Sequence, residues 1–257
     1  MTGSVRFANY SEAFPGWAKG LSVSHASLIQ TWRPCYTRLM HRVWILGLKL
    51  AGVAVVWCCW QLTANRNFSF FWSIAVVWGG IALVPPVAIA GRRLLDRRPT
   101  IERAAALSLL VHYLVIILLG CALIVAFRFT QAYPIARIAF PRKISLPVVQ
   151  ITGALAVLTV VNLAIGGLGL PFAAVQSRMI ATRWLYARCR NPMGLYSLLC
   201  FISGAVWLQS LHALLWTTLW LAPAWVVFVR LYEERELEIR FGESYLQYKA
   251  RTPFFGF

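Results

Sequence analysis

Long apolar stretches with almost no charge constrain this chain more than any other feature. A helix needs roughly 20 apolar residues to cross the hydrocarbon core of a bilayer, which is about 30 Å thick. Five stretches reach that length, and only Lys49 places a formal charge inside one; they are residues 43–62, 69–90, 104–127, 147–175 and 194–229. Backbone in lipid must satisfy its own hydrogen bonds, and the alternating pattern of a membrane barrel is absent. We therefore predict transmembrane helices.

The last stretch is too long for one crossing. A polar cluster of Gln209, Ser210 and His212 lies near its middle, so we predict a tight helical hairpin there. The predicted fold is all-α, a polytopic membrane helical bundle of about six transmembrane helices with a cytoplasmic amphipathic C-terminal helix. The predicted regions are a cytoplasmic or interfacial segment at 1–42, four transmembrane spans at 43–175, and the hairpin with its tail at 176–257.

The charged residues are few and mostly basic. Lys and Arg number 25 against 8 Asp and Glu, and 13% of residues are charged, compared with about 25% in soluble domains. An even number of spans places the N-terminal segment, the second and fourth loops and the C-terminal tail, all rich in Arg, on one side. Because such segments stay in the cytoplasm, we predict a multi-pass integral membrane protein of bacterial inner-membrane or endoplasmic-reticulum type, with both termini cytoplasmic. Basic residues dispersed along the flanks of spans do not indicate a nucleic-acid partner.

The third loop is the exception to this charge pattern, because its basic residues fall on the opposite side. These residues are Arg128, Arg137, Arg142 and Lys143. We interpret the loop as an interfacial segment anchored by snorkelling side chains.

Other polar features inside the stretches have simpler interpretations. His112 lies in the third stretch, and we interpret it as hydrogen-bonded to a neighbouring helix rather than as a ligand or base. The glycine-rich run at 166–171 lacks the strand and lysine of a phosphate loop, so it predicts a break at the end of the fourth span. The six cysteines have no metal-ligand spacing and predict free thiols, with no metal site.

Two cytoplasmic segments flank the predicted hairpin. Residues 186–193 lead into its first arm, and residues 233–253 follow its second arm and hold five of the eight acids. Apolar residues recur at helical spacing in the second segment, which predicts an amphipathic helix that continues from the last span and ends before Pro253. One interpretation is a solvated helix with Glu and Arg pairs. The other is a pocket, because a tight hairpin holds both segments at one membrane face and surrounds a ligand with carboxylates, a guanidinium and rings.

These segments also contain a spaced set of motifs. They are a Tyr, an Arg-Asn-Pro-Met sequence, a Glu-Glu pair after the hairpin, and a Phe-Gly-x-x-Tyr-x-x-Tyr run that ends near Arg and Pro. The residues are Tyr186, Arg190, Asn191, Pro192, Glu233, Glu234, Phe241, Gly242, Tyr245, Tyr248, Arg251 and Pro253. In this pattern the region of about 178–254 resembles the isoprenylcysteine carboxyl methyltransferase family of integral-membrane methyltransferases, which is related to the phospholipid N-methyltransferases. Family members usually have Tyr two residues after the Pro, where this chain has Gly194.

The resemblance implies S-adenosyl-L-methionine as the cofactor, membrane lipids and a lipophilic or lipid-modified substrate as partners, and methyl transfer to a carboxylate. By position, the residues that would bind the cofactor are Tyr186, Asn191, Pro192, Tyr196, Glu233 and Tyr245. Arg190, Glu234 and Arg230 are the candidate catalytic residues. Glu234 would assist or orient Arg190, and Arg230 lies beside the position that the family associates with its substrate.

The chemistry leaves the methyl acceptor open. Methyl transfer from a sulfonium is an in-line displacement, so positioning and a dry site dominate. A carboxylate acceptor needs no base, whereas an amine, thiol or phenol needs one, and Glu233 and Glu234 are the candidates. Two other functions stay open, a membrane reductase of the sterol-reductase type with a nicotinamide cofactor and a non-enzymatic membrane subunit. The near absence of carboxylates within the spans disfavours a transporter.

Overall fold

The computed structural model describes residues 46–133, 136–167, 169 and 177–256. The chain divides into two units, residues 1–48 and 49–257, and the second unit carries nearly all of the described structure. The predicted N-terminal segment at 1–42 lies outside the described residues, as does Cys35.

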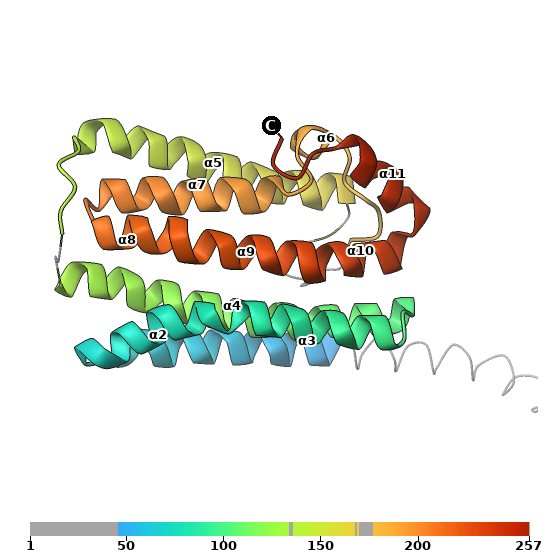
Figure 1. Cartoon of the computed structure of the whole chain (residues 1–257), viewed down its shortest axis with the longest axis horizontal. Coiled ribbons are helices and arrows are strands. Elements are labelled where there is room, and N and C mark those ends of the chain that lie inside the picture. The colour runs from blue at the N-terminus through green and yellow to red at the C-terminus, as the bar shows by residue number, and fades with distance from the viewer. Residues whose placement is uncertain (1–45, 134–135, 168, 170–176, 257) are drawn as a thin grey trace, which may run out of the picture. The chain divides into compact units, whose positions relative to one another are not determined.

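The regular secondary structure of the described residues is helical, apart from a single β-type bridge between Arg137 and Ser210. The first helix is Leu46–Asn65. The following elements are α2 (Phe70–Ala82), α3 (Val84–Arg97), α4 (Ile101–Ala132), α5 (Arg142–Gly167), α6 (Leu185–Arg188), α7 (Pro192–Trp207), α8 (Leu211–Trp216), η2 (Thr217–Leu221), α9 (Ala222–Phe228), η3 (Val229–Glu233), α10 (Glu234–Phe241) and α11 (Glu243–Arg251). Figure 1 shows α5, α7 and the α8–α10 series running side by side, and α2 and α3 lying along α4.

Five helices of the described part are long and apolar enough to cross a membrane, which supports a helical membrane protein. They are Leu46–Asn65, Phe70–Arg97, Ile101–Ala132, Arg142–Gly167 and Leu211–Phe241. The first arm of the predicted hairpin is a shorter apolar helix, α7, of 16 residues. The second arm is longer than predicted, because α8 to α10 form one stretch of 31 residues.

The hairpin turn lies where the polar cluster predicted it. Gln209 has a positive φ of 56°, and the side chain of Ser210 accepts a hydrogen bond from the backbone N–H of Ala213 and so caps α8. The third loop packs against this turn, since Gln209 Nε2 donates to the carbonyl of Phe140. Arg128, which we assigned to that loop, lies inside α4 and binds the backbone carbonyls of Ala64 and Arg66.

α5 ends at Gly167, inside the glycine-rich run where the sequence predicts a break, because glycine weakens a helix. The apolar stretch that extends to residue 175 runs on largely into residues outside the described part of the chain. One prediction about the tail is wrong. The tail is two helices rather than one continuous helix, because Gly242 adopts φ 55° and ψ −132° between α10 and α11. A residue without Cβ reaches this conformation easily, so the glycine turns the chain there. The tail still ends before Pro253, with Thr252 at the C-cap.

The last long helix contains two π-helical segments. The first, η2, ends just before Pro223, and the backbone N–H of Ala222 bonds the carbonyl of Thr217. Proline has no N–H to donate, and its ring crowds the carbonyl four residues back, so a widened turn relieves both conflicts. The second, η3, ends at Glu233 and therefore lies at the start of the acidic segment.

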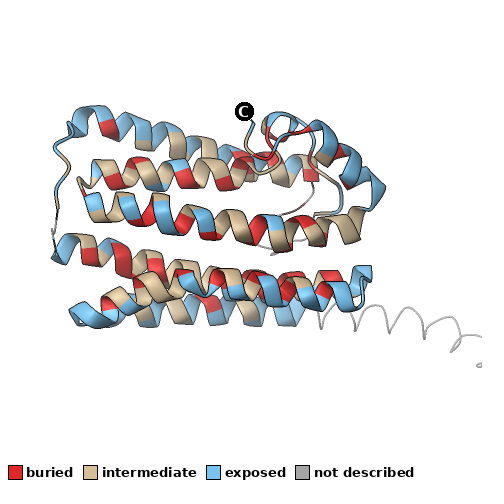
Figure 2. Cartoon of the chain, viewed as in Figure 1, coloured by how far each residue is buried: buried red, intermediate tan, exposed pale blue. Residues whose placement is uncertain are grey.

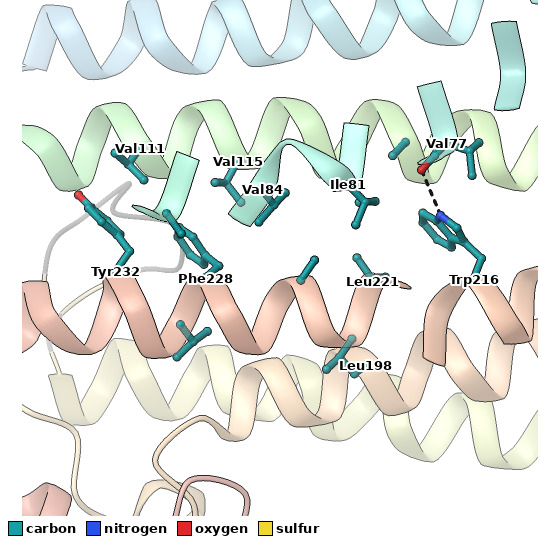
Figure 3. Close-up of a cluster of buried hydrophobic side chains, with 14 of the residues drawn as sticks. Val77, Ile81, Val84, Val111, Val115, Leu198, Trp216, Leu221, Phe228 and Tyr232 are labelled. Atoms are coloured by element: carbon teal, nitrogen blue, oxygen red, sulfur yellow. Dashed lines mark hydrogen bonds between the residues drawn. The ribbon is translucent and has the colours of Figure 1, made fainter. Parts of the chain in front are cut away.

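The core lies between α2, α3, α4 and the last long helix. Trp216, Phe228 and Tyr232 are almost fully buried there, and Figure 3 shows them facing Val77, Ile81 and Val84 on α2 and α3. Large apolar residues such as Phe71 and Leu219 lie on the outside instead, with 81% and 67% exposed. Figure 2 shows how much of the outer helix faces is exposed, as expected for helices that contact lipid.

Two aromatic residues of this core provide a matched stability test. Trp216 Nε1 donates a 3.1 Å hydrogen bond to the carbonyl of Val77, whereas the buried hydroxyl of Tyr232 has no partner among the described residues. We expect Trp216→Phe to lower the free energy of unfolding by about 2 kcal/mol, since it removes a bond and leaves a void. We expect Tyr232→Phe to be neutral or stabilising by up to about 1 kcal/mol, because it removes an unsatisfied polar group.

Unfolding in mixed micelles of rising SDS content measures both variants. Equal losses for the two variants would contradict this account of the core.

Candidate active site

The two segments that flank the hairpin are joined by hydrogen bonds. The hydroxyl of Tyr248 donates to the carbonyl of Tyr186 at 2.7 Å. The backbone N–H of Arg190 donates to the carbonyl of Pro253 at 3.0 Å, and the thiol of Cys189 donates to the carbonyl of Phe254 at 3.2 Å. Burial raises the pKa of Cys189 and of Tyr248, which keeps both groups protonated as donors. The tail therefore holds the 186–190 segment in place, as the predicted hairpin geometry requires.

A cavity of about 110 Å³ lies between these segments and α4. A single buried water needs only about 10–15 Å³, so this space admits a larger group. The polar residues of its lining are Ser108, Ser177, Tyr186, Arg190, Asn191, His112, Glu233, Glu234, Glu236, Arg240, Tyr245 and Tyr248. Leu163, Met193, Val229 and Phe241 are among the apolar residues that complete it.

Most carboxylates around the cavity are neutralised by a cation. Glu234 is buried and lies 3.0 Å from Arg190 Nη2 and 2.8 Å from Lys249 Nζ. Glu236, also buried, accepts from Arg240 Nη1 at 2.8 Å. Burial opposes the charge of Lys249, but its hydrogen bonds to Glu234 and Glu238 outweigh that cost and raise its pKa. These pairs stabilise charges that would be costly to bury alone.

Glu233 is different from its neighbours. It lines the cavity and has no ion pair or hydrogen bond from any side chain in the described part of the chain. Arg190 also has a spare group, because its buried Nε–H lacks a partner there, although its Nη1 donates to the carbonyl of Lys249. The cavity thus presents the unpaired carboxyl group of Glu233 and the unpaired Nε–H donor of Arg190. Glu234 Oε1 also lacks a hydrogen bond among the described residues, although it forms an ion pair with Arg190 Nη2. A ligand with hydroxyl or ammonium groups and a carboxylate would satisfy the Glu233 carboxyl group and the Arg190 Nε–H.

Six of the residues predicted from the sequence line this one cavity. They are Tyr186, Arg190, Asn191, Glu233, Glu234 and Tyr245. Burial raises the pKa of Tyr186 and Tyr245, so both rings stay neutral and can stack on a ligand.

The other three predicted residues lie outside the lining. Pro192 is buried at the first position of α7, and Tyr196 lies about one turn further along that helix. Arg230 is exposed, with its guanidinium 4.7 Å from the centre of the Phe254 ring. Arg230 lies within η3. The wider turn of a π-helix rotates side chains away from the positions that α-helical spacing predicts, so it changes the face that residues three and four apart share.

The sequence analysis missed the contribution of α4. Ser108 and His112 line the cavity, and His112 Nδ1 lies 2.7 Å from the carbonyl of Ser108 one turn earlier. The prediction that His112 bonds a neighbouring helix is therefore wrong, since its partner belongs to its own helix. A carbonyl partner requires a proton on Nδ1, which leaves Nε2 as a free acceptor. The available signal was an ionisable residue inside an apolar stretch, which is costly to bury without a role.

Comparison with models of known protein families, with curated proteins and with solved structures finds no significant match for this chain.

Removal of the Glu234 carboxylate should loosen the site. We expect Glu234→Gln to lower the free energy of unfolding by about 2–3 kcal/mol, because Arg190 and Lys249 both lose their closest anion in a partly buried setting. Glu243→Gln is the matched control, since Glu243 is an exposed acid of the same tail and accepts a side-chain hydrogen bond from Gln247. Limited proteolysis of the tail, measured beside unfolding, should show faster cleavage in Glu234→Gln alone. Equal behaviour of the two variants would show that this ion-pair network does not hold the tail.

Proposed function

We propose that this protein is an integral-membrane methyltransferase that uses S-adenosyl-L-methionine and acts on a lipophilic acceptor. The observation that carries the proposal is the cavity with the Glu233 carboxyl group, which has no ion pair in the described part of the chain, and the unpaired Arg190 Nε–H, enclosed by neutral tyrosine rings. The resemblance of the same segments to the isoprenylcysteine carboxyl methyltransferase family supports it independently of the geometry.

The residues of the cavity fit the groups of this cofactor. Glu233 would accept hydrogen bonds from ribose hydroxyls or from the ammonium group, and Arg190 Nε–H would donate to the carboxylate. Tyr186 and Tyr245 offer neutral ring faces for the adenine. Carboxylates nearby also favour a ligand that carries a sulfonium charge. The cofactor supplies an activated methyl group, so the protein has to bind, orient and exclude water.

The proposed acceptor determines whether a base is needed. A carboxylate attacks without losing a proton, as the family resemblance implies. An amine, thiol or phenol must give up a proton, and His112 joins Glu233 and Glu234 as a candidate base, because a hydrogen bond from Nδ1–H to the carbonyl of Ser108 would leave Nε2 of the neutral ring to take up that proton. An unprotonated imidazole in an apolar setting is suited to that step.

The proposed topology follows the charge pattern rather than the fold. With α7 counted as a short span, six spans place both termini and the cavity on the basic, cytoplasmic side. The water-soluble cofactor would then enter from the cytoplasm, and the acceptor from the bilayer.

The decisive test is cofactor binding. Purified full-length protein should bind radiolabelled S-adenosyl-L-methionine in equilibrium dialysis, and Glu233→Gln should bind about 10- to 100-fold more weakly, because the carboxyl group that would accept hydrogen bonds from the cofactor is replaced by an amide. Glu243→Gln, which changes an exposed acid outside the cavity, should bind like the wild type.

A parallel titration with NADPH separates the reductase alternative. Tight binding of NADPH with no binding of S-adenosyl-L-methionine would replace the proposed function by a reductase. No binding of either cofactor would favour the non-enzymatic membrane subunit.

A further inference from the structure

A second cavity, of about 220 Å³, lies inside the membrane-spanning part. Helix Leu46–Asn65, α4, α7 and the η2–α9 segment form its walls, and nearly all of its lining is apolar, including Trp60, Leu119, Phe201 and Trp225. Phe201 has 38% of its surface exposed on the outside of the helices. The cavity therefore reaches a lipid-facing surface, and an apolar chain is the ligand that its walls suit.

One polar group in this wall is unsatisfied. The indole Nε1–H of Trp225 is buried and has no hydrogen-bond partner among the described residues. The other indoles near it are satisfied, since Trp60 Nε1 donates to the carbonyl of Ile116 and Trp216 Nε1 to that of Val77. A buried donor without a partner costs free energy. A carbonyl oxygen on a bound chain would remove that cost.

Gly194 determines where this donor lies. A Cβ at position 194 would overlap Trp225 Nε1, so only glycine lets the indole N–H come so close to the backbone of α7. Tyr is the usual residue at this position in the family that the chain resembles. The glycine that this chain has in place of that Tyr therefore leaves room for the indole N–H of Trp225, which a larger side chain would displace.

The donor also lies at the end of the apolar cavity that adjoins the polar one. Met193, the residue before Gly194, lines both cavities. A ligand that extends from one to the other would place its junction between polar head and apolar chain beside Trp225. In acyl lipids that junction is an ester or amide carbonyl.

We propose that the apolar cavity binds the chain of an acyl lipid whose ester or amide carbonyl accepts a hydrogen bond from Trp225 Nε1. The acyl lipid is the methyl acceptor, a step that rests on the proposed function. A plain isoprenoid hydrocarbon would fill the same space but leave the indole donor unpaired. The site therefore favours an ester or amide over an unfunctionalised chain.

Photolabelling of the purified full-length protein tests the donor. The probes are palmitic acid methyl ester, a straight hydrocarbon and an isoprenoid hydrocarbon, all of matched length and with a diazirine at the chain end. Trp225→Phe keeps an aromatic ring but removes the N–H, so labelling by the ester should weaken about three- to tenfold while both hydrocarbons are unaffected. Trp60→Phe is the matched control, because its N–H is already bonded within the protein, and it should not weaken the ester selectively.

A second pair of variants tests the location. Ser197→Phe introduces a ring into the cavity lining, whereas Leu199→Phe introduces the same ring on the exposed face of α7. We expect Ser197→Phe to lose saturable labelling of α7 and the η2–α9 segment, and Leu199→Phe to keep it. Labelling that is unchanged in Ser197→Phe, or that cannot be competed, would show non-specific lipid contact and overturn the proposal. Ester and hydrocarbon probes that respond equally to Trp225→Phe would overturn the carbonyl assignment.

These experiments need no cofactor, so their outcome is separate from that of the proposed function. Saturable ester labelling without binding of S-adenosyl-L-methionine would support the lipid site and contradict the proposed methyltransferase function. Binding of S-adenosyl-L-methionine without saturable labelling would support the methyltransferase function and contradict the lipid site.

Discussion

The ion pairs of Glu234 hold together the segments that form the polar cavity. This buried carboxylate lies between Arg190, which precedes α7, and Lys249 of α11, so it joins the beginning of the hairpin to the tail. The side chains of Arg190 and Lys249 are 13% and 33% exposed, and that of Glu234 is 6% exposed. Because these charges are partly or fully shielded from water and share one anion, they contribute more to stability than two isolated surface ion pairs would. With the segments joined, two further hydrogen bonds can form, one from the backbone N–H of Arg190 to the carbonyl of Pro253 and one from the Tyr248 hydroxyl to the carbonyl of Tyr186. The position of Glu233 at the cavity wall depends on that arrangement.

Charge neutralisation also explains why Glu233 is distinctive. In a chain with 25 basic and 8 acidic residues, an acid would be expected to find a cation easily. Glu234, Glu236 and Glu238 each do so. Glu233 lies among these acids at the end of a π-helical segment, where the wider turn changes which side chains lie above one another. An unpaired carboxylate is costly in such a place, and a bound cationic or hydroxylated ligand would offset that cost.

Sequence patterns predicted the helical membrane fold and the meeting of the 186–193 segment with the acidic tail, because hydrophobic length and a polar turn directly restrict the chain. The turn at Gly242 and the 31-residue length of the last helix were not predicted, since they depend on local backbone conformation and not on hydrophobicity. The contribution of His112 could not be predicted either. It reaches the cavity only because α4 packs beside α10, and the packing partners of an almost uniformly apolar helix leave little trace in its sequence.

The two cavities together suggest how a membrane protein can bring a soluble and a lipophilic ligand to one place. The polar cavity gathers charged and hydroxyl-bearing groups at one end of the last long helix, and the apolar cavity lies further along the same helix among residues that suit a chain. Met193 lines both, and the next residue, Gly194, lies against the unpaired indole N–H of Trp225. An apolar wall alone would accept any chain at any depth. A single buried donor at the junction fixes the depth of a carbonyl, and with it the position of the head group relative to Glu233.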